Sequence, residues 1–246
     1  MGGKHCCVVG CTNSTTWPKV YTGRVQEGLG YLYCCPGPGP EPESDTGDGV
    51  SEWVTMASRG EFHFPHAKVL YPTAPLRHYT PMGGAMSNVW FDRMQISPTV
   101  PEHSQSVEAM CANLSTLIQE QVANGIPKSR IIIGGFSMGG AMALHLTYRF
   151  HRDVAGVFAL SSFLNNGSAV YKELESVPKN SPLPPLFYCQ GEKDELALPI
   201  WAENTFSQLS AVGVQGVFKK YPIYHELNKA ELGALQTWIK GRIPES

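Results

Sequence analysis

The segment RIIIGGFSMGGAMALHL, residues 130–146, places Ser137 between glycines in the pattern G-F-S-M-G. In a G-x-S-x-G motif the serine lies on a sharp, strained turn between a strand and a helix, where larger neighbours would clash. The Ile-rich run before Ser137 predicts a buried strand, and the residues after it predict a helix. We therefore predict that Ser137 is a nucleophile and that the N–H of Met138, at the helix start, binds an oxyanion. The alternative is that the glycines only allow the helix to pack closely against the strand, and that Ser137 has no catalytic role.

The base that such a serine needs can be found by elimination. A serine hydroxyl is a weak nucleophile unless a base accepts its proton and an acid orients that base. In α/β-hydrolases these residues occur in the chain order serine, acid, histidine. His145 and His151 belong to, or directly follow, the helix that Ser137 begins, so His225 remains, in the loop YPIYHEL. The histidines that precede the serine are His5, His63, His66, His78 and His103.

The acid is chosen from residues that follow the serine. Asp153 precedes an expected strand and so lies at the opposite edge of the sheet. Asp194 directly follows PLFYCQGEK, at the edge where α/β proteins place their sites. Glu192 and Glu195 compete with it, and we expect both to be solvated loop charges. The predicted catalytic triad is Ser137, Asp194 and His225.

Strands and helices alternate through most of the chain. In TVPE, residues 99–102, Thr99 and Glu102 fit a capping box at the start of a helix that ends at Gly125. In the last helix we expect Leu232, Leu235, Trp238 and Ile239 to face inward. This alternation predicts an α/β fold whose mostly parallel sheet has helices on both faces. The other expected strands are 67–72, 130–136, 154–162, 185–191 and 217–222, and the other expected helices are 138–150, 200–212 and 228–240.

The amino-terminal residues differ in composition from the rest. Residues 36–49, PGPGPEPESDTGDG, contain too little apolar surface to offset their ordering entropy, which is typical of a flexible linker. Residues 1–35 show no clean period, although GLGYLYCC at 28–35 fits one short strand. We expect residues 1–62 to be a poorly ordered, cysteine-rich start followed by a Pro/Gly linker, and residues 63–246 to be the α/β domain.

Charge and cysteine content exclude several classes of protein. The net charge of −2, with dispersed Lys and Arg, gives no patch for nucleic acid. No apolar run reaches the roughly 18 residues of a membrane span, and no secretory leader is evident, so we expect a cytosolic protein without stable membrane insertion. Five of the seven cysteines lie in the first 35 residues. HCCVVGC suggests zinc, but no C-x-x-H follows to complete a site, so we expect reduced thiols and no metal.

Four segments together resemble the acyl-protein thioesterase and lysophospholipase family: GGFSMGGAMALHL, QGEKDELALP, the His225 loop and YPTAPLRHYTPMGGAMSNVWFD. The resemblance runs from about Phe64 to Pro244. Within the family, a methionine after the serine resembles the pattern of the lysophospholipase-like branch. It implies serine-dependent hydrolysis of carboxylic esters or thioesters, including S-acylated proteins, without any cofactor. It also implies that NVWFD, residues 88–92, lies near the acyl-binding mouth, with Trp90 and Phe91 as substrate-binding candidates. Plain core packing is the alternative for both.

The chain departs from this family at its amino-terminal end. Members have a strand that leads into an H-G-x-G-D-type loop, which supplies the second oxyanion N–H. No His-Gly pair occurs in this sequence, so we expect that strand to be missing or replaced, with GLGYLYCC or SEWVTMAS (51–58) as candidates. Loss of one oxyanion donor lowers kcat by about a hundred- to a thousandfold. Two hypotheses follow: an active hydrolase, and a catalytically impaired variant that binds an acyl group or a protein.

Overall fold

Strand direction determines where functional residues can gather in this chain. The computed structural model describes residues 6–7, 46–178 and 181–245, and within them six strands form one sheet in the order β2-β1-β5-β6-β7-β8. Every neighbouring pair is parallel, so all six carboxyl ends lie at the same edge. The strands are β1 (Cys6–Cys7), β2 (Lys68–Val69), β5 (Ile131–Phe136), β6 (Gly156–Leu160), β7 (Leu186–Gly191) and β8 (Gly216–Tyr221).

The inner strands are buried from end to end. Every residue of β5, β6 and β7 is buried, as expected for parallel strands that have helices on both faces. β8 lies at the outer edge of the sheet, and its residues are exposed or half-buried. Ile131, Phe158 and Tyr188 are among the fully buried side chains of the resulting core.

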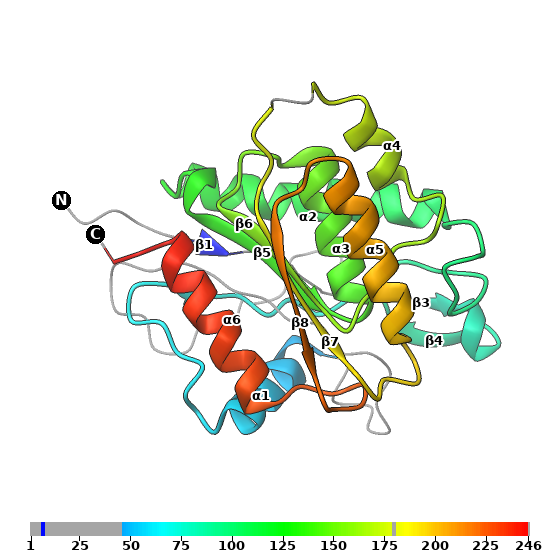
Figure 1. Cartoon of the computed structure of the whole chain (residues 1–246), viewed down its shortest axis with the longest axis horizontal. Coiled ribbons are helices and arrows are strands. Elements are labelled where there is room, and N and C mark those ends of the chain that lie inside the picture. Colours follow the sequence, from blue (N-terminus) through cyan, green and yellow to red (C-terminus); the bar gives the residue numbers. More distant parts are fainter. Residues whose placement is uncertain (1–5, 8–45, 179–180, 246) are drawn as a thin grey trace.

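Helices cover both faces of this sheet (Figure 1). Gly135 of β5 lies against α3 and pairs with Ala159 of β6, whereas Gly156 of β6 lies against Trp238 of α6. Because strand residues alternate between faces, α3 and α6 lie on opposite sides of the sheet, and α1 packs beside α6. No helix in the described ranges is long and apolar enough to cross a membrane. The helices are α1 (Gly47–Ser58), α2 (Ser104–Ala123), α3 (Met138–His145), α4 (Ala169–Glu175), α5 (Pro199–Ala211) and α6 (Lys229–Arg242).

A second, small sheet stands apart from the first. It is an antiparallel hairpin of β3 (Leu76–Tyr79) and β4 (Ala85–Asn88), joined by a 3-10 turn at Thr80–Met82, and it lies at the right of the view in Figure 1. The carboxylate of Asp92 accepts hydrogen bonds from the N–H of Thr80 (2.8 Å) and from its hydroxyl (2.7 Å). These bonds attach the hairpin turn to the loop that leads into α2.

The expected alternation of strands and helices is confirmed. β5, β6, β7, α5, β8 and α6 begin and end within two residues of their predicted bounds, and Leu232, Leu235 and Ile239 are fully buried while Trp238 is partly buried. The expected helix at 138–150 is divided, because α3 passes into a π-helix at Leu146–Phe150. There the N–H of His151 bonds to the carbonyls of both Leu146 and Thr147.

The predicted capping box at 99–102 is wrong. Helix α2 begins at Ser104, and its N-cap is His103, whose ring accepts from the N–H of Ser106. Glu102 does not reach back to Thr99, since its carboxylate contacts His145 of α3 and the N–H of Ala169 at the start of α4. The side chain of Glu102, which the local pattern assigned to the helix cap, therefore forms tertiary contacts instead.

The expectation that residues 1–62 are poorly ordered is corrected for residues 46–62. The side chain of Thr46 caps α1 by accepting from the N–H of Gly49 (3.1 Å), and Val50 and Val54 are each 1% exposed. SEWVTMAS is thus helix rather than a replacement strand, because its apolar side chains recur at helical spacing and pack beside α6. GLGYLYCC and most of the Pro/Gly linker lie outside the described residues.

The position beside β5 is occupied by β1. Cys6 pairs with Ile131 and Lys68, and Cys7 pairs with Ile132 and Val69, so this two-residue strand joins β5 to β2. Over these two residues, the cysteine-rich start therefore takes the place of the strand that was expected to be missing or replaced.

Glu231 of α6 predicts a stability that falls as the pH rises. Its side chain is fully buried, and neither carboxyl oxygen has a hydrogen-bond partner in the described part of the chain. Burial raises the pKa to about 8, and the N–H of Asn228, which lies near the carboxyl group without forming a full hydrogen bond to it, lowers it only slightly. The folded chain keeps Glu231 neutral up to that pH, whereas the unfolded chain ionises it above about pH 4.5. Stability is therefore lost between these two values.

We expect Glu231→Gln to remove this loss. Relative to the natural chain, the variant's gain in unfolding free energy grows by about 4 kcal/mol between pH 5 and pH 8. Urea unfolding at several pH values measures the difference, with Glu175→Gln, at an exposed position of α4, as the control. A difference between Glu231→Gln and the natural chain that stays constant over this range would contradict the prediction.

Candidate active site

Ser137 adopts a strained backbone conformation at the end of β5. Its φ of 53° and ψ of −123° lie where side-chain-bearing residues are rare, and such conformations cost about 1–3 kcal/mol. The residue is also the N-cap of α3. Its N–H donates to the carbonyl of Leu160, the last residue of β6, at 2.8 Å. The strand-turn-helix context predicted for the motif is therefore present.

Two glycines make this turn sterically possible. A Cβ on Gly135 would lie 2.4 Å from the carbonyl carbon of Gly139 and 2.8 Å from the nitrogen of Gly140. A Cβ on Gly140 would lie 2.7 Å from the Cβ of Ser162. These glycines therefore let the first turn of α3 lie directly against the ends of β5 and β6.

The structure brings the three predicted triad residues into one hydrogen-bonded chain. His225 Nε2 lies 3.0 Å from Ser137 Oγ, and His225 Nδ1 lies 2.7 Å from Asp194 Oδ2. Asp194 follows β7, and His225 lies between β8 and α6. Because these strands are parallel, three segments far apart in sequence meet at one sheet edge.

Asp194 is held as a buried carboxylate. Its side chain is fully buried, and Oδ1 accepts from the N–H groups of Leu196 (2.9 Å) and Ala197 (2.8 Å). Oδ2 accepts from His225 and from Gln190 Nε2, the latter at 3.2 Å. Burial by itself raises the pKa of Asp194, but hydrogen bonds and charge from His225, together with the loop N–H groups, hold it below its usual value. The side chain is thus ionised and fully hydrogen-bonded.

The competing residues lie elsewhere. Glu192 and Glu195 are exposed, as expected for solvated loop charges. Asp153 forms an exposed ion pair with Lys128 at 3.0 Å. His151 is bonded to the hydroxyl of Ser115.

Phe136, between Gly135 and the serine, connects α1 to the histidine. Its ring centroid lies 4.6 Å from that of His225 and 5.0 Å from that of Trp53, the latter in an edge-to-face arrangement. Trp53 belongs to α1. Sequence reasoning missed this support because it treated α1 as part of a poorly ordered start, although the spacing of Val50, Trp53 and Val54 is helical.

Met138 is the first residue of α3. The first N–H groups of a helix have no carbonyl partner within it and carry the positive end of the helix dipole. The N–H of Met138 is therefore in the position predicted for an oxyanion donor. The segment that follows β1, where a second donor was sought, lies outside the described residues.

Trp90 and Phe91 lie in the hydrophobic core, with exposed fractions of 2% and 4%. Their neighbour Arg93 is also buried, and its guanidinium stacks on Phe91 and on Phe163 at 5.0 and 5.2 Å from the ring centroids. This burial supports the core-packing alternative for Trp90 and Phe91, and their contribution to substrate binding stays a prediction.

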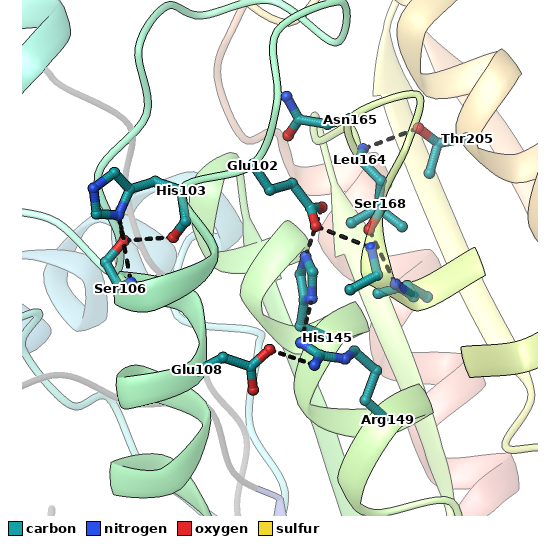
Figure 2. Close-up of polar contacts among 12 residues, drawn as sticks. Glu102, His103, Ser106, Glu108, His145, Arg149, Leu164, Asn165, Ser168 and Thr205 are labelled. Carbon is teal, nitrogen blue, oxygen red and sulfur yellow. Dashed lines mark hydrogen bonds and ion pairs between the residues drawn. The ribbon is translucent and has the colours of Figure 1, made fainter. Parts of the chain in front are cut away.

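A buried polar network connects His145 of α3 to the loop before α2 and to neighbouring helices (Figure 2). Glu102 Oε1 lies 3.0 Å from His145 Nε2, and Glu102 Oε2 accepts from the N–H of Ala169 at 3.0 Å. Arg149 Nη1 lies 3.3 Å from His145 Nδ1, and Arg149 also pairs with Glu108 of α2. His145 thus lies between the guanidinium of Arg149 and the carboxylate of Glu102, and its Nε2–H donates to Glu102 Oε1.

This network connects the loop before α2 to α3 and α4. The side chains of Glu102 and His145 are 8% and 2% exposed. Burial by itself raises the pKa of Glu102, but the hydrogen bond and the charge of His145, together with hydrogen bonds from Ser168 and the N–H of Ala169, lower it to about 2. The sequence shows an acidic residue before one helix and a histidine in the next, but nothing in it reveals that Glu102 and His145 are partners.

No group of three or more metal-binding side chains occurs among the residues that the structure describes. Cys111 and Cys189 are free and buried there. The zinc hypothesis concerned the amino-terminal cysteines, whose side chains lie outside this description.

A family model described as Phospholipase/Carboxylesterase matches residues 45–243 of the 246-residue chain. The chain belongs to this family. The match begins next to Thr46 and so includes α1. Membership confirms the expected α/β-hydrolase fold, and the phospholipase/carboxylesterase family is one of serine hydrolases.

Several proteins with similar sequences or structures are named as lysophospholipase-like proteins or acyl-protein thioesterases. Mouse lysophospholipase-like protein 1 is 49% identical over 224 residues, which cover 91% of this chain and 90% of the relative. Acyl-protein thioesterase 1 of Neurospora crassa is 30% identical over 207 residues, covering 82% and 84%. The crystal structure of Zea mays acyl-protein thioesterase 2 has the same fold, with a TM-score of 0.76 at 22% identity over 92% of this chain and 100% of that one. The resemblance to acyl-protein thioesterases and lysophospholipases is confirmed.

The Glu102 network predicts a second pH-dependent stability, of opposite sign to that of Glu231. Since the folded pKa of Glu102 lies below its ordinary 4.5, the ionised group contributes stability above about pH 4.5 that is lost as the pH falls toward 2. We expect Glu102→Gln to lower the unfolding free energy by about 3 kcal/mol at neutral pH, because an amide cannot accept from both His145 and Ala169.

Denaturant unfolding between about pH 2 and pH 7 measures this difference, which is expected to shrink at acid pH. The control is Glu173→Gln, whose half-exposed side chain pairs with Arg152 at 3.4 Å, and where less than about 1 kcal/mol is expected. Equal stability of the two variants at pH 7 would show that the Glu102 network makes no net contribution.

Proposed function

We propose that this chain is a serine hydrolase of carboxylic esters and thioesters, with Ser137, His225 and Asp194 as its catalytic triad. The observation that carries the proposal is the continuous chain of hydrogen bonds, 3.0 Å from Ser137 Oγ to His225 Nε2 and 2.7 Å from His225 Nδ1 to Asp194 Oδ2. Family membership supports the same reaction class.

Acylation follows from the protons that this arrangement holds. Ser137 Oγ attacks the acyl carbonyl carbon while His225 Nε2 accepts its proton, and Asp194 stabilises the resulting imidazolium. The N–H of Met138 donates to the oxyanion that forms. When the tetrahedral intermediate collapses, the bond to the alcohol or thiol breaks, and His225 returns the proton to that leaving group. The product is an ester of Ser137.

Deacylation uses the same residues with water as the nucleophile. His225 Nε2 accepts a proton from water as the water oxygen attacks the acyl carbon. The intermediate expels Ser137 Oγ, which regains the proton from His225, and the carboxylic acid leaves. The proposed sequence needs neither a metal nor an organic cofactor, since every proton passes between the triad, the substrate and water.

The substrate class comes from the relatives. The names lysophospholipase-like protein 1 and acyl-protein thioesterase 1 belong to proteins 49% and 30% identical to this chain. From these names we infer that the substrates of this chain are acyl esters or thioesters, S-acylated proteins among them. Trp90 and Phe91 would form part of the wall of the acyl-binding site. These two side chains are buried beside Arg93 in the loop that precedes α2.

A catalytically impaired acyl or protein binder is the second candidate. It is favoured by one observation, that the chain contains no His-Gly pair to supply a second oxyanion donor. A chain of this kind keeps the triad geometry but turns over slowly, because one oxyanion donor is worth on the order of a hundred- to a thousandfold in kcat.

The first test is active-site labelling. We expect a fluorophosphonate probe to label the natural chain at pH 7–8 and Ser137→Ala not at all, because only an activated serine attacks the phosphorus. Hydrolysis of a fluorogenic thioester by the same two proteins measures turnover. Labelling without turnover, together with a bound acyl ligand, would favour the second candidate. Equal labelling of both proteins would remove the triad proposal.

The second test concerns the orientation of the histidine. Asp194→Asn is expected to lower kcat by about 10⁴, because an amide at this position favours the wrong imidazole tautomer. Asp153→Asn is the matched control, since that carboxylate is exposed and pairs with Lys128 far from the site. Steady-state ester hydrolysis provides both values, and a loss below about tenfold in Asp194→Asn would contradict the assigned role of Asp194.

A further inference from the structure

Gln190, next to the last residue of β7, is a fully buried polar side chain with a one-sided environment. Three acceptors surround its amide nitrogen: the carbonyl of Ala197 at 2.8 Å, the carbonyl of Gly191 at 3.2 Å and Asp194 Oδ2 at 3.2 Å. Its amide oxygen, in contrast, is buried without any partner in the described residues.

This asymmetry fixes the orientation of the amide. Turning the group by 180° would bring its oxygen against the two carbonyls and the Asp194 carboxylate, all of which only accept. The nitrogen therefore faces the loop, and its two hydrogens are shared among three acceptors. Gln190 thus acts on this loop as a donor only.

Gly191 is the last residue of β7, and the other two acceptors lie in the loop that follows it and carries Asp194 away from the sheet. Within that loop the carboxylate is held on one side only, because the N–H groups of Leu196 and Ala197 both bond to Oδ1. Oδ2, the oxygen that faces His225, has no donor from its own loop. Besides the histidine, its hydrogen-bond partner in the described residues is Gln190.

We propose that Gln190 is a positioning residue for hydrolysis, whose amide fixes Oδ2 of Asp194 in the orientation that accepts the Nδ1–H of His225. The inference rests on the proposed function. β7 is the rigid element here, and one side chain connects it to both ends of the loop and to the carboxylate between them. A neutral amide is suited to this place, because it donates to Oδ2 without neutralising the charge that stabilises the imidazolium.

The main variant is Gln190→Met, which keeps the length of the side chain and removes its donor. We expect kcat to fall by about 10- to 100-fold with KM changed by less than about twofold, because a misplaced histidine affects the transition state more than binding. Gln121→Met, at a buried position of α2, is the matched control.

A second variant, Gln190→Glu, keeps the shape and tests the donor. When protonated, its carboxyl donates one hydrogen bond to the loop, and when ionised it repels Asp194. We therefore expect its kcat/KM, relative to the natural chain, to fall as the pH rises from about 6 to 8. A merely structural role for Gln190 would instead leave this ratio constant and change only the melting temperature.

The Nδ1–H proton resonance of His225 separates this inference from the proposed function. It is assigned by its loss in His225→Gln and is expected to shift in Gln190→Met but not in Gln121→Met. Failure of the natural chain to label at Ser137 would refute the hydrolase proposal, yet the resonance would still decide whether Gln190 orients the pair. An unchanged resonance, or Gln190→Met kinetics equal to those of Gln121→Met, would overturn the inference.

Discussion

One backbone hydrogen bond holds the turn on which the rest of the site depends. The N–H of Ser137 donates to the carbonyl of Leu160 at 2.8 Å, and this bond connects a residue at φ 53° to the end of the neighbouring strand. A strained conformation persists only where its surroundings determine it. Here the close contacts of Gly135 and Gly140 leave the first turn of α3 no room to relax. The direction of Oγ is thus set by the sheet rather than by the serine itself.

The other two residues of the proposed triad lie on loops and need separate support. His225 is backed by the ring of Phe136, which in turn packs on Trp53 of α1. Asp194 is held by two N–H groups of its own loop and by the amide of Gln190. Each loop residue is therefore oriented from a strand or helix, as precise catalytic geometry requires.

The sequence predicted the parts of this structure that depend on chain order and local spacing. The order serine, acid, histidine selected three residues that do lie within hydrogen-bond distance of one another, and the buried strands were evident from their apolar runs. Helix α1 was missed because the acidic Pro/Gly segment before it masks the helical spacing of Val50 and Val54. The contact of Glu102 with His145 joins residues 43 positions apart, so no local pattern reveals it. The same long-range contact explains why the local capping pattern failed.

The π-helix at Leu146–Phe150 has a consequence for how the chain can vary in length. A π-turn contains one residue more than the α-turn it replaces, so it behaves as an insertion that the helix has absorbed. Each residue of an α-helix turns the chain by about 100°. Loss of one residue between His145 and Arg149 would therefore shorten their separation from four residues to three and alter the way Arg149 meets His145 and Glu108, while leaving α3 and Ser137 in place. The length of this helical segment is thus constrained by the contacts of Arg149 and not by the turn that carries Ser137.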